Sequence, residues 1–336
     1  MEILLLLPVV LSFFLVVFLM PYWIRKAHQI ELMWDDMNKL NSPKVAGSGG
    51  VVTVIGFVFG VLAYVAIKTF YFKSSNGNLV GIFAILSVIL LVSLGGFIDD
   101  LFGWRKGGLS KKSRILLILF SAIPLMVINA GVSTIFIPFV GTTNLGIFYA
   151  LVIIPLGVLG ASATFNILAG YNGLEAGQGI LILSALALMS FFTGSTWLSV
   201  IALCMISALF AFLLFNKYPA KVFPGDGLTY SVGAMAACMA ILGNYEMFAV
   251  FIFIPYGIET IFKLRGRLKK QSFGLPQKDG SIKNRYDKIY GLEHLAIKIL
   301  SKFKKEVYEW EVVILIYGFQ VLIIALGFLI FLFNAA

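Results

Sequence analysis

Residues 80–98 read VGIFAILSVILLVSLGGFI, an apolar run without a charged side chain, and Asp99 and Asp100 follow it directly. A helix needs roughly 20 apolar residues to cross the hydrocarbon core of a bilayer. The run therefore predicts a transmembrane helix that ends in two carboxylates. Carboxylates at a helix C-terminus face the negative end of the helix dipole, so this pair requires a compensating cation or a positive ligand environment.

Similar runs recur along the whole chain, whose 336 residues are 60% hydrophobic and 12% charged. Soluble domains contain about 25% charged residues, so the composition excludes a soluble globular protein. The runs are also too long for the strands of a membrane barrel, which alternate over about 10 residues. We predict an all-α polytopic membrane protein, formed as a single domain over residues 1–336. Its spans, about ten by length, are expected at residues 3–24, 49–70, 80–98, 114–130, 147–165, 179–193, 196–215, 228–243, 246–263 and 311–333.

The basic residues divide the loops between the two sides of the membrane. The loops after the first, third, fifth, seventh and ninth spans hold, with their edges, 24 of the 26 Lys and Arg residues, and only Lys68 and Lys73 fall on the other side. Basic residues collect on the cytoplasmic face of membrane proteins. We therefore expect these five loops to be cytoplasmic and both termini to lie outside. The same rule accounts for the net charge of +10 without a nucleic acid as partner.

The last cytoplasmic loop, residues 264–310, is long enough to form structure of its own. Between Leu292 and Val307 apolar residues recur at helical spacing among lysines. This pattern predicts an amphipathic helix that lies in the membrane interface and contacts membrane lipids. A solvated linker helix is the alternative interpretation.

Acidic and amide side chains gather in two other cytoplasmic loops. Residues 166–178 read NILAGYNGLEAGQ, and residues 218–226 read YPAKVFPGD, so that Asp226 opens the eighth span. Carboxylate and amide oxygens suit Mg²⁺, and glycines let backbone N–H groups approach a phosphate or a base. The simpler alternatives are an Asn-Gly turn in the first loop and an ordinary helix N-cap at Asp226. With Asp99 and Asp100, these loops predict a Mg²⁺ and phosphate site on one face.

The motifs NILAGYNGLEAGQ and YPAKVFPGD, together with FIDD at residues 97–100, closely resemble those of the polyprenyl-phosphate N-acetylhexosamine-1-phosphate transferase superfamily. The resemblance covers the ten spans and the order of the loops. It is strongest to the archaeal and eukaryotic branch, the UDP-GlcNAc:dolichyl-phosphate GlcNAc-1-phosphate transferases. It implies an active site on the cytoplasmic side of a prokaryotic, archaeal plasma membrane.

By position, the resemblance implies Asn166 and Asp226 as ligands of Mg²⁺, with Mn²⁺ as a substitute. It implies Asp99 and Asp100 as the essential carboxylates near the phosphates. We favour these two aspartates as organisers of metal, lysine and lipid phosphate, because a phosphate monoester with a second pKa near about 6 needs no obligatory proton acceptor at neutral pH.

The remaining site residues also follow from the resemblance. Asn166 and a basic residue after the aspartate pair would hold the lipid phosphate, and the spacing leaves both Lys111 and Lys112 open. The nucleotide sugar is assigned to a larger set: Lys39, Asn172, Gly173, Leu174, Glu175, Lys269, Lys270 and Gln271. The last three stand where the eukaryotic branch has Arg-His-Arg.

The implied reaction moves GlcNAc-1-phosphate from UDP-GlcNAc to a polyisoprenyl phosphate such as dolichyl phosphate, and UMP leaves. It would be the first committed step of lipid-linked oligosaccharide synthesis for N-glycosylation. The same chemistry with another UDP-HexNAc, or with undecaprenyl phosphate for cell-wall polymers, is the alternative. A transporter is a rival class, because transporters carry ionisable residues near the middle of their spans. Here Glu259 is the one candidate, and Lys263, one helical turn later, can pair with it. A monomer and a homodimer both stay open.

Overall fold

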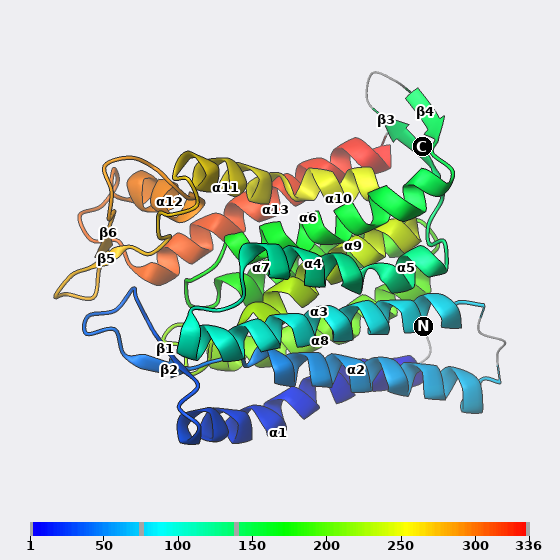
Figure 1. The fold of residues 1–336 in the computed structure, drawn as a ribbon, viewed down its shortest axis with the longest axis horizontal. Helices are drawn as coiled ribbons and strands as arrows, with labels where there is room; N and C mark the ends of the chain where they lie inside the picture. The colour runs from blue at the N-terminus through cyan, green and yellow to red at the C-terminus, as the bar shows by residue number, and fades with distance from the viewer. Residues whose placement is uncertain (1–2, 74–76, 138–140, 334–336) are drawn as a thin grey trace.

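The computed structural model describes residues 3–73, 77–137 and 141–333, and it is mostly helical (Figure 1). The helices are η1 (Ile3–Leu6), α1 (Leu7–Gln29), α2 (Gly50–Ala66), η2 (Ile67–Tyr71), α3 (Leu79–Lys106), α4 (Lys111–Ser121), α5 (Ile123–Val127), η3 (Tyr149–Ile153), α6 (Ile154–Ile167), α7 (Leu174–Phe192), α8 (Thr196–Asn216), α9 (Asp226–Gly243), α10 (Glu246–Ile252), α11 (Ile254–Arg265), α12 (Leu292–Leu300) and α13 (Glu309–Phe333). The strands form three antiparallel pairs: β1 (Met33–Asp35) with β2 (Lys44–Ala46), β3 (Thr134–Ile137) with β4 (Gly141–Asn144), and β5 (Leu275–Pro276) with β6 (Ile282–Lys283).

Eight helices in the described part of the chain are long and apolar enough to cross a membrane, and the bent pair α10–α11 makes a ninth candidate. The helical membrane fold predicted from composition is confirmed. The fourth predicted span, residues 114–130, is split into α4 and α5, of 11 and 5 residues. Proline lacks the N–H that would continue a helix. Accordingly Pro124 stands in the first turn of α5, and Pro255 stands in the first turn of α11, where the axis bends by 54°.

The loops that carry the predicted chemistry meet at one end of the bundle, and both termini lie at the other end (Figure 1). The β1–β2 pair and the segment between α11 and α13 are at the left of that view. The β3–β4 pair lies at the right, beside the ends of the chain. The chain therefore changes ends in the order that the division of basic residues predicts.

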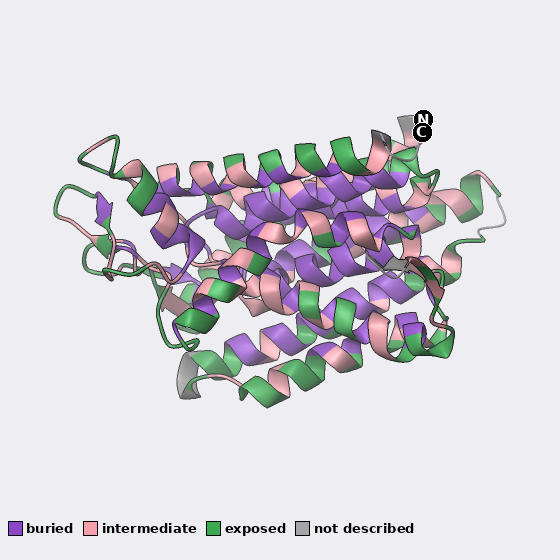
Figure 2. Ribbon diagram, turned by 90° about the horizontal axis from the view of Figure 1, so that it is seen from above, coloured by how far each residue is buried: buried purple, intermediate pink, exposed green. Residues whose placement is uncertain are grey.

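Helix α9 forms the centre of the bundle. Of its spanning segment 89% is buried, against 22% for the spanning segments of α1 and α13, and it packs against α2, α3, α6 and α7. Figure 2 shows buried residues along the middle of the molecule and exposed residues on the outer helices. Many of the exposed side chains are large and apolar, as Phe14 and Phe18 of α1 are. Such a surface marks contact with membrane lipid.

The last loop folds against the bundle, and its helix is shorter than the sequence pattern suggested. Helix α12 ends at Leu300, so the prediction of a helix continuing to Val307 is wrong. Its apolar residues Leu292 and Ile297 are buried, because α12 packs on α11 and α13. Phe303, in the turn after the helix, is 84% exposed.

The α1–α2 contact predicts a packing defect at one glycine. A Cβ atom on Gly60 would lie 1.9 Å from Ser12 Oγ and 2.8 Å from the Pro8 carbonyl oxygen. We expect Gly60→Ala to destabilise the protein by about 1–3 kcal/mol, the usual cost of overpacking, and to lower the melting temperature in detergent. Gly318→Ala in α13 is the control, since a Cβ there meets no atom within 4 Å. Equal melting temperatures for the two variants would contradict the packing argument.

Candidate active site

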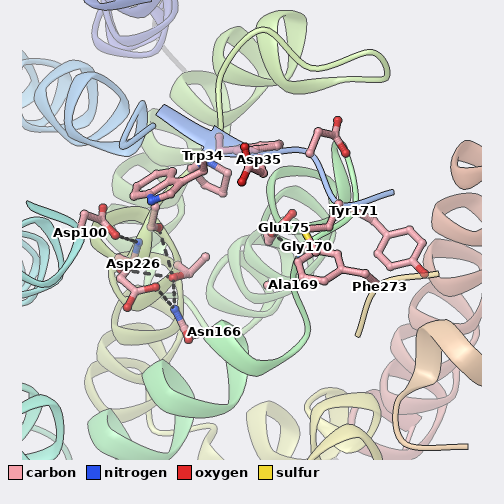
Figure 3. Close-up of a pocket in the computed structure, with 16 residues that line it drawn as sticks. Trp34, Asp35, Asp100, Asn166, Ala169, Gly170, Tyr171, Glu175, Asp226 and Phe273 are labelled. Atoms are coloured by element: carbon pink, nitrogen blue, oxygen red, sulfur yellow. Dashed lines mark hydrogen bonds between the residues drawn. The ribbon is translucent and has the colours of Figure 1, made fainter. Parts of the chain in front are cut away.

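A cavity of about 330 Å³ lies among the loops at this end of the bundle (Figure 3). Asp100, Asp226 and Asn166 lie together on one side of it in Figure 3, and Glu175, Gly170, Tyr171 and Phe273 lie on the other. The described residues that line it include no Lys or Arg, but they include five carboxylic acids: Asp35, Asp36, Asp100, Glu175 and Asp226. Like charges repel strongly at short range. An anionic ligand can therefore bind in this cavity only together with a cation.

Asp226 and Asn166, the two predicted Mg²⁺ ligands, are in direct contact. The Asn166 Nδ2 donates hydrogen bonds to Asp226 Oδ1 at 2.8 Å and to Thr229 Oγ1 at 2.7 Å. Asp226 is the first residue of α9, and the N-cap position is taken by Gly225, with no side-chain cap. The alternative of an ordinary helix cap at Asp226 is therefore wrong. The resemblance placed these two residues at one site, and in the structure they are hydrogen-bonded to each other.

Asp100 ties α3 to the start of α9. Its Oδ1 accepts the backbone N–H of Asp226 at 2.9 Å, and its Oδ2 accepts the Ser48 hydroxyl at 2.9 Å. The two helices approach closely here, since a Cβ on Gly96 would lie 2.5 Å from the Gly227 nitrogen. Asp100 lines the cavity, whereas Asp99 does not.

Asp99 faces α4 and pairs with Arg114. The Arg114 Nε is 2.6 Å from Asp99 Oδ2, and Asp99 Oδ1 accepts the Leu109 backbone N–H at 2.6 Å. The Arg114 Nη1 also lies 4.0 Å from Asp226 Oδ2. Burial lowers the pKa of the guanidinium, but Asp226 and Asp99 more than offset this, so its pKa lies above the ordinary value.

Arg114 is a basic residue near Asp226 that sequence reasoning missed, although it does not line the cavity. Lys111 and Lys112, the two predicted candidates, occupy the first turn of α4 and are exposed. Arg114 is one turn further along α4 from the Ser110 N-cap and faces α3. The N-cap serine, three residues before Ser113, was the available signal for where this helix begins.

Lys39 lies in a buried polar network behind the cavity. Its Nζ is 2.8 Å from Asp36 Oδ2 and 2.5 Å from Glu309 Oε2. It also donates a hydrogen bond to Asn172 Oδ1 at 3.2 Å. Burial lowers the pKa of Lys39, but Glu309 and Asp36 outweigh that effect, so the pKa lies above its ordinary value and the side chain stays charged. Lys39 does not line the cavity, and its charge is already balanced within the protein.

The residues predicted to bind uridine differ in their position relative to the cavity. The Asn172 backbone N–H donates to Glu309 Oε1 at 2.7 Å, and Leu174 is fully buried. Gly173 has a φ of +86° and precedes the first residue of α7. Of the four residues from Asn172 to Glu175, only Glu175 lines the cavity. The structure therefore brings the loop to the site while holding most of these side chains behind it.

The predicted sugar contacts in the last loop lie away from the cavity. Lys269, Lys270 and Gln271 are exposed, and none of them lines it. The Lys270 Nζ lies 4.9 Å from the centre of the Tyr286 ring. The residue of this loop that does line the cavity is Phe273. A single aromatic residue in a basic loop has no spacing that marks it, so no sequence pattern pointed to Phe273.

Two contacts anchor the segment around Phe273. Lys263 donates a hydrogen bond to Ser272 Oγ, and the Gly274 backbone N–H donates to Asn38 Oδ1 at 3.0 Å. The first contact comes from α11 and the second from the loop between β1 and β2. The segment that carries the Phe273 ring is thus held between α11 and the first loop.

The oxygen ligands near Asp226 suit a metal that a substrate helps to bind. Among the described residues, no three His, Cys, Asp or Glu side chains form a metal site by themselves. Asp226 keeps 26% of its side chain exposed, and the Asn166 amide nitrogen is engaged, so its oxygen is the atom left for a cation. Mg²⁺ usually binds one or two carboxylates, waters and substrate phosphates. The residues present fit that kind of site.

Comparison with known proteins decides the family. Residues 82–244 match glycosyl transferase family 4. A relative from Saccharolobus solfataricus is 37% identical over 94% of this chain and 93% of its own length. The chain belongs to glycosyl transferase family 4. The resemblance seen in its motifs is confirmed, and the protein is an integral membrane phospho-sugar transferase.

Relatives of this chain are named for two different enzyme activities. That of Saccharolobus solfataricus is provisionally named a UDP-N-acetylglucosamine–dolichyl-phosphate N-acetylglucosaminephosphotransferase. A Dictyostelium discoideum relative of the same name is 28% identical over 70% of this chain and 65% of its own. A Streptococcus pyogenes relative, 30% identical over 76% of this chain and 77% of its own, is named a phospho-N-acetylmuramoyl-pentapeptide-transferase.

The geometry around Arg114 predicts which basic residue the transferase needs. We expect Arg114→Gln to lower turnover by roughly 100-fold, the usual effect of removing one donor to a developing charge. Lys111→Gln and Lys112→Gln should reduce it much less, because these lysines face solvent. Steady-state rates of the three purified variants, each normalised to folded protein, make the comparison. A larger loss in either lysine variant would support the original sequence assignment against Arg114.

Proposed function

We propose that this transferase moves GlcNAc-1-phosphate from UDP-GlcNAc to a polyisoprenyl phosphate such as dolichyl phosphate, and that UMP is the leaving group. The observation that carries the proposal is a cavity walled by five carboxylic acids, with the guanidinium of Arg114 4.0 Å from Asp226. An acidic cavity beside one fixed cation suits a metal-bound diphosphate and a second phosphate. The names of the archaeal and Dictyostelium relatives support UDP-GlcNAc and dolichyl phosphate as the substrates.

The proposed metal is Mg²⁺, held by Asp226 and Asn166 together with the substrate diphosphate. When bound, it would neutralise the phosphate oxygens against the surrounding carboxylates. Asp100 holds the start of α9 through the Asp226 backbone and so keeps the Asp226 side chain at the cavity. Mn²⁺ is expected to substitute, because it accepts the same oxygen ligands.

The proposed reaction forms one bond and breaks one. An oxygen of the lipid phosphate attacks the β-phosphorus, and the bond from that phosphorus to the oxygen bridging to the α-phosphate breaks. UMP carries away the electron pair. The lipid phosphate is largely dianionic at neutral pH, with a second pKa near about 6, so no side chain has to take its proton. We assign the lipid phosphate to Arg114 and give Asp99 the role of orienting that guanidinium, which it contacts at 2.6 Å.

We place the nucleotide at the end of the cavity formed by Gly170, Tyr171 and Phe273. The Phe273 ring packs closely on Gly170, since a Cβ there would lie 2.8 Å from a ring carbon. An aromatic ring at the cavity offers a base a surface on which to stack. The contribution of Lys269, Lys270 and Gln271 to sugar binding stays a prediction, and none of these residues lines the cavity.

Substitution of Asp226 tests the proposed reaction. With purified protein, labelled UDP-sugars and a set of lipid phosphates, we expect Mg²⁺-dependent release of UMP and preference for UDP-GlcNAc with dolichyl phosphate. Asp226→Asn should lower turnover by about 100-fold or more while the melting temperature stays near that of the wild type. EDTA should stop the reaction, and Mg²⁺ or Mn²⁺ should restore it. Full activity of folded Asp226→Asn protein, or transfer in EDTA, would refute the metal assignment, and preference for undecaprenyl phosphate would refute the acceptor.

We further propose that the cavity faces the cytoplasm and that both termini lie outside, with an archaeal plasma membrane as the setting. The support is the division of the basic residues, of which only Lys68 and Lys73 are on the side of the termini. UDP-sugars are cytoplasmic metabolites. With the cavity on the cytoplasmic side, the donor would reach it directly.

Two single cysteines test the orientation. Lys269 and Thr142 are exposed at opposite ends of the bundle, and the native Cys204 and Cys238 are buried. A membrane-impermeant maleimide should label Thr142→Cys in intact cells and Lys269→Cys only after the membrane is opened. The reverse pattern would place the cavity outside and overturn the proposed orientation.

A further inference from the structure

We propose that Glu309 is a positioning residue for the nucleotide-sugar donor, and that its pairing with Lys39 fixes the two loops that form the donor side of the cavity. The inference rests on the proposed function, because it takes UDP-GlcNAc as the donor. Glu309 itself does not line the cavity. It acts through Asn38, Lys39 and Asn172, which lie one or two positions from residues that do.

The first line of support is the contact set of Glu309. Its Oε2 lies 2.5 Å from the Lys39 Nζ, and its Oε1 accepts the Asn172 backbone N–H at 2.7 Å. The Asn38 Nδ2 lies 3.4 Å from the same Oε1 and donates to the Gly170 carbonyl at 2.9 Å. One carboxylate at the start of α13 therefore holds two loops that are far from it in sequence, one of them 270 residues away.

The second line of support is where those loops lead. Asp36, which is paired with Lys39, lines the cavity. Gly170 and Tyr171, which precede Asn172, line it as well. A shift of Lys39 or Asn172 would therefore move both loops at the proposed nucleotide site. The side of Asp100 and Asp226 is held by separate contacts and should not move.

The third line of support is charge. Asp36 and Glu309 retain 3% and 2% of their side-chain exposure, and Lys39 retains 17%. Two nearly buried carboxylates share one ammonium, so removal of Lys39 leaves like charges facing each other at low solvent exposure. Removal of the Glu309 charge instead leaves a balanced Asp36–Lys39 pair, so the chain can still fold. This difference makes Glu309→Gln the informative variant, since its amide can still accept the Asn172 N–H.

Glu311 provides a matched control on the same turn of α13. It pairs with Lys304 and accepts the Tyr308 backbone N–H at 2.8 Å, and both of these partners lie in the last loop. Glu311→Gln therefore removes the same charge from the same helix end without touching the donor side. Any general effect of a lost carboxylate at the start of α13 should appear in both variants.

The experiment compares wild type, Glu309→Gln and Glu311→Gln as full-length purified proteins. UDP affinity is measured by calorimetric titration, KM is measured for UDP-GlcNAc and for dolichyl phosphate, and melting temperature is recorded for each. For Glu309→Gln we expect the UDP Kd and the donor KM to rise about tenfold, the lower end of the effect of losing a residue that orients a ligand-binding group, with acceptor KM nearly unchanged. Glu311→Gln should match the wild type in all three binding constants.

A double variant checks that Glu309 and Lys39 act together. Lys39→Met should raise the donor KM, and Lys39→Met with Glu309→Gln should raise it by no more than Lys39→Met alone, because the two residues belong to one contact. Unchanged UDP affinity in Glu309→Gln, a lower melting temperature alone, or equal increases in donor and acceptor KM would each overturn the positioning role. If the wild type binds UDP and Glu309→Gln gives one of these results, only this inference is refuted. If the wild type binds no UDP, the proposed function is refuted as well.

Discussion

The hydrogen bond from the Asp226 backbone N–H to Asp100 joins the two helices on which the site depends. It lies where α3 and α9 come closest, at Gly96 and Gly227, and it fixes the first residue of the most buried helix in the bundle. An unsatisfied backbone N–H in this setting would cost the desolvation of a buried polar group. The same bond therefore stabilises the helix start and aims the Asp226 side chain at Asn166. Asp100 therefore has a structural role besides its charge, whereas Asp226 contributes only its backbone N–H to this bond and would keep it in Asp226→Asn.

A second organising feature is the division of labour among the acidic residues. Asp99 pairs with Arg114, Asp100 holds the start of α9, and Glu309 holds the loops, while Asp226 keeps part of its side chain open to the cavity. Adjacent residues on a helix point in directions about 100° apart, since a turn takes 3.6 residues. This is why Asp99 and Asp100, neighbours in sequence, meet different partners. An aspartate pair of this kind is therefore two positions with separate tasks.

The sequence predicted the helical membrane fold and the shared end of the loops, because apolar run length and charge distribution are local properties of the chain. The family resemblance placed Asn166 and Asp226 at one site, and the structure brings them into contact. Sequence reasoning missed the breaks before Pro124 and Pro255, since both lie inside continuous apolar runs. Where the structure places a predicted site residue behind the cavity or adds a residue beside it, the reason is a contact that the sequence does not display. Lys39 and Asn172 look like ligand residues, but their partners are Asp36 and Glu309, and a pairing across 270 residues leaves no local pattern. Arg114 and Phe273 were missed because helix phase and loop path, rather than spacing, bring them to the site.

The separation of these partners along the chain has a consequence for synthesis. A membrane protein is made from its N-terminus, and Asp100 precedes Asp226 by 126 residues, while Lys39 precedes Glu309 by 270. At about 5–20 residues per second, Lys39 waits on the order of tens of seconds for its carboxylate. During that interval the first loop carries an ammonium and Asp36 without the last helix to close around them. The proposed donor side of the cavity is therefore the last part of the molecule to be completed, and a chain that stops before α13 contains the residues that line it but not Glu309, which holds their loops in place.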